Sequence, residues 1–269
     1  MTEKQYRKKW LRWHGQYEKL AYKELIKGFR DLGNSIPFTF MTEDNYEIFL
    51  NNNLKQEQFL NIYYNIYKEV GTIHGLRTGK QINQQLKEFT VNAFLSQFDR
   101  NLIGWLLENA TDRITIVKET YLEYLKQIIT QGIADGKSMS QIATELTKRI
   151  NQRNFYRWQA LRIARTETTA AANYAAMQSA DVSGVVMEKV WISATDSRTR
   201  RPPKSEFNHL QMNGVRIPKK EYFKVPFNGG FEKVMFPGDP KASAGNVINC
   251  RCSSAVVPKR DKDGNIIRI

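Results

Sequence analysis

The chain has 269 residues, of which 41% are hydrophobic, and its net charge is +14. This hydrophobic content is enough for a folded core, which excludes a wholly disordered chain. No run approaches the roughly 18 apolar residues of a membrane span, and no apolar stretch follows the basic N-terminus as in a secretory signal. We therefore expect a protein without a membrane contact that stays in the cytoplasm unless other machinery carries it out.

The positive charge is concentrated at the two ends of the chain. Residues 1–30 carry nine basic and three acidic residues, residues 31–185 carry sixteen of each, and residues 186–269 carry sixteen basic and eight acidic ones. A basic surface attracts polyanions through counterion release, without sequence preference. Charge that serves solubility alone is the alternative. A neutral middle between two basic ends favours a polyanion contact.

The first 30 residues predict a helix with one aromatic face. Residues on this face recur at spacings of four and three: Tyr6, Trp10, Trp13, Tyr17 and Leu20. Gly33 and Pro37 are expected to end the helix. Such a stripe either packs on its own domain or reaches a partner, and we favour packing within the domain.

Further helices are predicted along the chain to residue 180. The first candidates cover residues 43–70, 82–109 and 115–132, with Gly71, Gly75 and Gly79 breaking the pattern between the first two. Ser138 or Ser140 can cap a helix whose apolar face includes Ile142 and Leu146. The alanine-rich segment 158–180 has high helix propensity and a smooth surface for close packing.

After Gly184 the composition becomes rich in proline and in alternating apolar residues. We predict strands at 185–192 and 247–257, and a hairpin over 210–217 with Asn213–Gly214 as its turn. A second turn is expected at Asp263–Gly264. The fold class is therefore α+β, a mostly helical N-terminal region followed by a small β-rich C-terminal domain. The expected domains are a helical region 1–135, a domain 136–257 (helices 136–180, β-rich 185–257) and a tail 258–269.

The sequence contains no common enzyme signature. A Gly-rich phosphate loop, a His-Glu-x-x-His motif and a Gly-x-Ser-x-Gly motif are all missing. The acidic residues of the C-terminal part are dispersed among basic ones, whereas a metal-dependent nuclease needs them clustered. We therefore expect no catalytic residues and no enzyme activity.

Four residues of the C-terminal part have side chains that bind zinc: Asp196, His209, Cys250 and Cys252. Alternate residues of an extended chain point the same way, so the two sulfurs of Cys250 and Cys252 share one face. The expected role is a structural zinc that ties loops of a small domain together. The alternative is two small buried residues and a histidine that bonds a backbone carbonyl.

The segment 197–204 places four cations in eight residues: Arg198, Arg200, Arg201 and Lys204. Basic side chains that contact a nucleic-acid backbone need no sequence-reading geometry. The segment is therefore a candidate contact for DNA phosphates, or equally for an acidic protein surface.

Several short motifs between Arg162 and Val257 occur in an order that resembles the Mu F-like phage head-morphogenesis family. They include Arg-Ile-Ala-Arg-Thr-Glu-Thr from Arg162, Lys-Val-Trp from Lys189, Pro-Gly-Asp-Pro from Pro237 and Asn-Cys-Arg-Cys from Asn249. The motif residues of interest are Arg165, Thr166, Glu167, Trp191, Asn249 and Arg251. The segment from Gly136 to Ala143 resembles the helix that precedes this domain in the family. The resemblance covers about half of the chain.

The resemblance implies a minor capsid protein of a tailed bacteriophage. Members of the family are incorporated into the procapsid in few copies, associate with the portal protein and the inner head, and contact packaged DNA. The expected partners are therefore the portal protein, the major capsid or scaffold protein and double-stranded DNA. The expected location is the virion, inside the head near the portal, after assembly in the host cytoplasm.

Two alternatives remain open. The same module is also found joined to toxin domains, which suggests a toxin-like nuclease or transferase, but the chain ends twelve residues after Val257 and we expect no appended toxin domain. The other alternative is a generic, sequence-independent DNA-binding protein.

Overall fold

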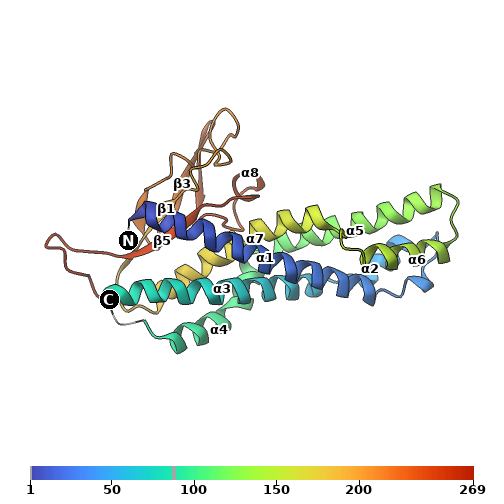
Figure 1. The fold of residues 1–269 in the computed structure, drawn as a ribbon, viewed down its shortest axis with the longest axis horizontal. Helices are drawn as coiled ribbons and strands as arrows, with labels where there is room; N and C mark the ends of the chain where they lie inside the picture. Colours follow the sequence, from blue (N-terminus) through green and yellow to red (C-terminus); the bar gives the residue numbers. More distant parts are fainter. Residues whose placement is uncertain (1, 87–88) are drawn as a thin grey trace.

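The computed structural model describes residues 2–86 and 89–269, which form a long helical body with a β-rich part at one end (Figure 1). The helices are α1 (Glu3–Ser35), the 3-10 turn η1 (Phe38–Phe40), α2 (Tyr46–Asn53), α3 (Gln56–Leu86), α4 (Val91–Asn109), α5 (Thr111–Ala134), α6 (Met139–Ile150), α7 (Arg157–Asp181) and α8 (Ala244–Val247). The strands are β1 (Met187–Ile192), β2 (Arg216–Pro218), β3 (Phe223–Phe227), β4 (Gly230–Val234) and β5 (Ser253–Pro258). The predicted α+β class is confirmed.

Helix α1 begins at a capping residue and ends just before a proline. The Thr2 hydroxyl accepts a hydrogen bond from the Gln5 backbone, and the Gln5 side-chain oxygen accepts one from the Thr2 backbone N–H, which together form a capping box. The helix stops at Ser35, just before Pro37. Tyr6, Trp10 and Tyr17 are buried, so the aromatic stripe packs on the protein's own core, as predicted.

The prediction that glycines interrupt the helix at residues 71–79 is wrong. Helix α3 runs without interruption from Gln56 to Leu86. Each of these glycines faces one phenylalanine ring: Gly71 faces Phe98, Gly75 faces Phe94 and Gly79 faces Phe89. A Cβ atom at any of the three positions would overlap the ring. The glycines therefore form a flat side of α3 on which α4 and the residues before it lie closely.

The neighbouring helix predictions need two further corrections. The single helix predicted over 43–70 is divided into α2 and α3, because Leu54 adopts an extended conformation after α2. The helix predicted over 82–109 is also divided, since α3 ends at Leu86 and α4 begins at Val91. Residues 87–88 of that prediction lie outside the described residues.

The close packing on the glycine side of α3 predicts opposite effects on stability for two Gly→Ala substitutions. Gly75→Ala should lower the free energy of unfolding by about 1–3 kcal/mol, the usual cost of overpacking a filled core. Gly104→Ala in α4 should raise it by about 0.5–1 kcal/mol, because alanine favours the helix and nothing lies within 4 Å of the added Cβ. Urea unfolding of both variants measures the two values. Equal stability of the two variants would contradict the close packing of α3.

Helices α6 and α7 follow the sequence closely. Ser138 caps α6 in a second capping box, with Gln141 as its partner. Helix α7 lies in the middle of the molecule and is buried over most of its length by α1 and α3 (Figure 1). One hydrophobic core joins residues of the predicted helical region to residues of the following domain. Among the helices of the described residues, none is long and apolar enough to cross a membrane.

The β-rich part contains a three-stranded antiparallel sheet in the order β2-β1-β5 and a separate β3-β4 hairpin. The prediction of a hairpin with Asn213–Gly214 as its turn is wrong. These residues make a turn that leads into β2, and β2 pairs with β1. The observed hairpin instead joins β3 to β4. The strand predicted over 247–257 begins only at Ser253, because α8 and an irregular segment precede it.

Candidate metal centre

The two cysteines and one histidine meet in the small core of the β-rich part. The Nδ1 atom of His209 lies 3.6 Å from the sulfur of Cys250 and 3.6 Å from the sulfur of Cys252. One ligand atom from each residue lies within 4.8 Å of the other two. All three residues are at most 2% exposed. The structure thus brings together three of the four predicted zinc ligands.

The hydrogen bonds around His209 leave its Nδ1 atom free to bind a metal. The Asn246 amide nitrogen donates to the Glu232 carboxylate over 2.6 Å, so the Asn246 oxygen faces the histidine. That oxygen lies 2.7 Å from Nε2 of His209 and can only accept, so Nε2 carries the proton. When the ring is uncharged, its lone pair is then on Nδ1, which faces the sulfurs. A histidine held through its second nitrogen is typical of metal ligands.

The two nitrogen–sulfur distances fit zinc. Zn–S and Zn–N bonds of about 2.3 and 2.1 Å at a tetrahedral angle separate S and N by about 3.6 Å, which matches the two distances. A hydrogen bond from Cys252, together with the neighbouring His209 and Arg200, lowers the pKa of Cys250 well below its usual range. The same hydrogen bond, together with burial, raises the pKa of Cys252 well above its usual range, so the thiolate form is favoured at Cys250 alone.

Asp196, the fourth predicted ligand, lies outside this group. Its carboxylate forms an ion pair with Arg251 at 2.6 Å and accepts a hydrogen bond from the Arg198 backbone. This ion pair is the main favourable cause of its lowered pKa, which burial opposes. In the structure Asp196 therefore fixes the backbone near the cysteines, through Arg251, and does not face the sulfurs.

Side chains of α7 and α1 hold the cysteine segment from the opposite side. The Thr169 hydroxyl donates to the carbonyl of Cys250 over 2.5 Å. Asn173 accepts from the Ser254 backbone over 2.8 Å, and the Trp10 indole donates to the carbonyl of Arg251 over 2.8 Å. The backbone just before β5 and at its start is thus paired with helix side chains where a strand would otherwise pair with a neighbour. No local sequence signal points to Thr169, Asn173 or Asn246 in this role, because their partners are distant in the chain.

The motif residues from the two ends of the C-terminal half meet at this centre. Arg165 forms an ion pair with Glu18 of α1 at 2.6 Å and donates to the Asn249 side chain over 3.2 Å. The Asn249 backbone donates to the Thr166 hydroxyl over 3.0 Å, and Asn249 adopts a positive φ of 59°. These bonds hold the turn that starts the cysteine segment. The fully buried Trp191 lies edge-on to His209, with ring centroids 5.4 Å apart.

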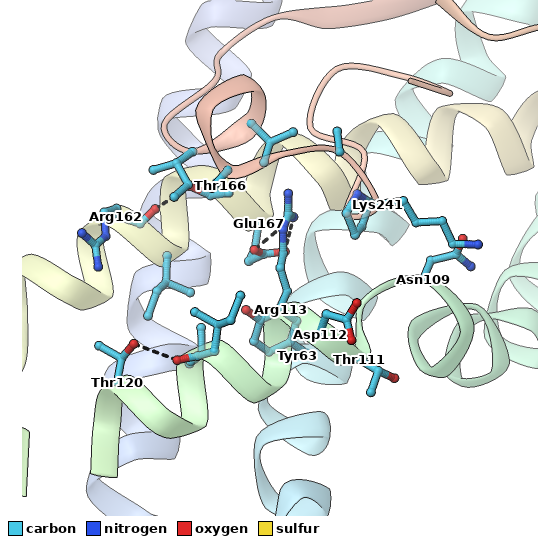
Figure 2. Close-up of a pocket in the computed structure, with 18 of the residues that line it drawn as sticks. Tyr63, Asn109, Thr111, Asp112, Arg113, Thr120, Arg162, Thr166, Glu167 and Lys241 are labelled. Carbon is cyan, nitrogen blue, oxygen red and sulfur yellow. Dashed lines mark hydrogen bonds and ion pairs between the residues drawn. The ribbon is translucent and has the colours of Figure 1, made fainter. Parts of the chain in front are cut away.

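The remaining motif residue, Glu167, lies at a pocket of about 370 Å³ between α5, α7 and the segment before α8. Figure 2 shows Arg113 and Glu167 pointing toward each other at this pocket. The guanidinium of Arg113 lies 3.2 Å from both carboxylate oxygens, and the Tyr67 hydroxyl donates to Glu167 over 2.8 Å. The pair is almost fully buried, with side chains 12% and 3% exposed. It joins the N-terminal helices to α7.

The predicted contact loop is only partly free. Arg200 donates to the carbonyl of Ile248, and Arg201 donates to the carbonyl of Asp196 over 3.3 Å. Arg198 and Lys204 are exposed. Two of the four cations in the loop therefore bond to backbone carbonyls of the protein itself, and the other two are exposed to a partner.

Comparison with known proteins identifies a family match over the part of the chain that carries this centre. Residues 123–255 match the model of the family described as "Phage Mu protein F like protein". The chain is also 31% identical over 150 residues to the "Uncharacterized protein YqbB" of Bacillus subtilis (strain 168). That alignment covers 56% of this chain and 46% of the relative, so the chain spans about half the length of the curated relative it matches. No solved structure matches the chain.

Proposed function

Because residues 123–255 carry the module of the phage Mu protein F-like family, we propose that this chain is a minor head protein of a tailed bacteriophage. It acts in procapsid assembly at the portal and the inner surface of the head. Its partners are the portal protein and the major capsid or scaffold protein, and it meets packaged double-stranded DNA there. The family match is the observation that carries this proposal.

The arrangement of the motif residues supports a structural role for the module. Residues from α7 and from the segment before β5 bond to each other around one buried centre, and α1 contributes Trp10 and Glu18 to the same contacts. Such a network fixes the orientation of the β-rich part on the helices. A rigid connection of this kind suits a protein that must present two surfaces to two neighbours in a particle.

We further propose that Cys250, Cys252 and His209 hold a structural zinc ion. Zinc bound to these residues would join the segment before β5 to the loop that carries His209. Both segments are irregular, and they make few regular backbone hydrogen bonds of their own. In small domains with few strands, the free energy of metal binding is part of the free energy of folding.

The direct test is co-purification of the chain with its portal protein. An affinity-tagged portal co-expressed with this chain should retain it through size-exclusion chromatography after nuclease treatment, which removes DNA as a bridge. Loss of the chain from the portal, with salt-sensitive DNA binding instead, would identify a general DNA-binding protein. Nucleic-acid cleavage or group transfer by the purified chain would support the toxin-like alternative and overturn the proposal.

A further inference from the structure

Helix α1 separates its charges onto two sides. Seven cations follow one another along it: Lys4, Lys8, Lys9, Arg12, Lys19, Lys23 and Lys27. At about 100° per residue they occupy an arc of about 140°. The acidic residues of α1 are Glu3, Glu18, Glu24 and Asp31, and all of them fall outside that arc. The buried aromatic stripe lies opposite the cations, so packing of α1 on the core turns the basic side to solvent.

The seven cations, which we call the basic face of α1, are not engaged within the protein. All seven are exposed, and no hydrogen bond or ion pair of their side chains occurs within the described residues. Other charges of α1 are used internally: Arg7 donates to the carbonyl of Ser193, and Glu18 pairs with Arg165. From Lys4 to Lys27 the basic face spans about 35 Å along the helix axis.

A pocket of about 360 Å³ adjoins the end of the basic face, between α1 and the start of α7. Its lining residues are Tyr22, Ile26, Arg30, Arg153, Arg157 and Leu161. Three of the six are arginines and none is acidic. Arg30 is held by a hydrogen bond of 2.9 Å from its guanidinium to the carbonyl of Gln152, and its buried Nε atom has no partner. The neighbouring Trp158 is 78% exposed, with Arg157 over its ring.

The chemistry of this surface fits a phosphodiester backbone better than a protein. Specific protein interfaces have an apolar, often aromatic core with few lysines, whereas the basic face consists of cations spread along one side of a helix. Duplex DNA carries a negative charge about every 1.7 Å of its axis, so such a band of long, exposed cations can pair with phosphates at many registers. Arginines in a shallow pocket suit bidentate phosphate contacts.

We propose that the basic face of α1 and the adjoining arginine pocket bind the phosphate backbone of double-stranded DNA, without sequence preference. This surface offers more free cations than the loop at 198–204, in which Arg200 and Arg201 bond to backbone carbonyls. This inference rests on the proposed function only in placing the DNA contact inside the phage head. Portal association is tested on the wild-type chain after nuclease treatment, and DNA binding is tested on lysine variants, so the two proposals can fail separately.

The test measures binding of a fluorescent 30-base-pair duplex by the full chain at several salt concentrations. Replacing Lys19, Lys23 and Lys27 with glutamine removes three cations, and glutamine has a helix propensity close to that of lysine. The slope of log K against log salt should fall in magnitude by about 2.7, and affinity at 0.1 M salt should fall on the order of 10²–10³-fold. Arg153→Gln with Arg157→Gln should reduce the slope by about 1.8.

The matched control replaces Lys80, Lys220 and Lys262 with glutamine. These lysines are also exposed, and the variant has the same net charge as the first one, but they lie outside the basic face. It should keep nearly the wild-type slope. Equal losses in both triple variants would show that net charge alone attracts DNA and would overturn the assigned surface. An unchanged slope in the Lys19, Lys23 and Lys27 variant, with normal helix content by circular dichroism, would also overturn it.

Discussion

A chain with Cys250→Ser is expected to lose the zinc proposed for this centre and much of the stability of the β-rich part. Serine keeps the size of the side chain but supplies no thiolate, which leaves two protein ligands. Because metal binding contributes directly to folding in such centres, the cost should be several kcal/mol. Metal content by mass spectrometry of the purified protein, with thermal unfolding of the same sample, measures both effects. Adding a chelator to the wild-type protein should lower its unfolding temperature toward that of the variant.

Asp196→Asn is the control for this experiment. Asp196 lies outside the histidine and cysteine group and pairs with Arg251, so the variant should keep its zinc. A zinc loss equal to that of Cys250→Ser would make Asp196 a ligand, as the sequence alone had suggested. Wild-type protein that contains no zinc after growth in zinc-supplemented medium would remove the metal proposal, and would leave the pair of thiols as buried core residues.

Arg113→Met is expected to lower the free energy of unfolding by about 3–5 kcal/mol, because it leaves the carboxylate of Glu167 buried without its cation. The Glu167 side chain is only 3% exposed. The double variant with Glu167→Met should recover part of this loss, since an apolar pair of similar volume avoids burying a charge. Chemical denaturation of the two single variants and the double variant gives the change in the free energy of unfolding for each.

An exposed ion pair provides the comparison. Lys68 and Asp99 lie 3.0 Å apart with side chains 47% and 52% exposed, so Lys68→Met should cost only about 0–1 kcal/mol. If Arg113→Met costs no more than Lys68→Met, then the pair at the pocket does not join the N-terminal helices to α7. The stability of that junction would have to come from apolar packing alone.

Local signals were sufficient for several elements of the fold. The aromatic spacing of the first helix, the cap at Ser138 and the alanine-rich segment each depend on residues within a few positions of one another, and all three predictions are confirmed. The glycines of α3 misled the prediction for a physical reason. Glycine weakens an isolated helix, but here the missing Cβ makes room for rings that follow 10 to 27 residues later in the chain.

The candidate site could be predicted only in part. Residue chemistry was enough to select His209, Cys250 and Cys252, because few side chains bind zinc. The position of Asp196 could not be predicted, since its competing partner Arg251 lies 55 residues away. The hydrogen bonds that link Glu232 to Asn246 and Asn246 to His209 also could not be predicted from the sequence, because amides and carboxylates of this kind are common in loops. Likewise, the sequence drew attention to the loop at 198–204, and only the structure showed that the basic face of α1 is free.

A role in head assembly is tested most directly by the protein composition of procapsids, purified from cells that express the head genes with or without the portal gene. We expect this chain to be present in a few copies per procapsid, by quantitative mass spectrometry, and to be lost when the portal is missing. Procapsids that form normally with the portal and contain none of this chain would contradict a role in head assembly.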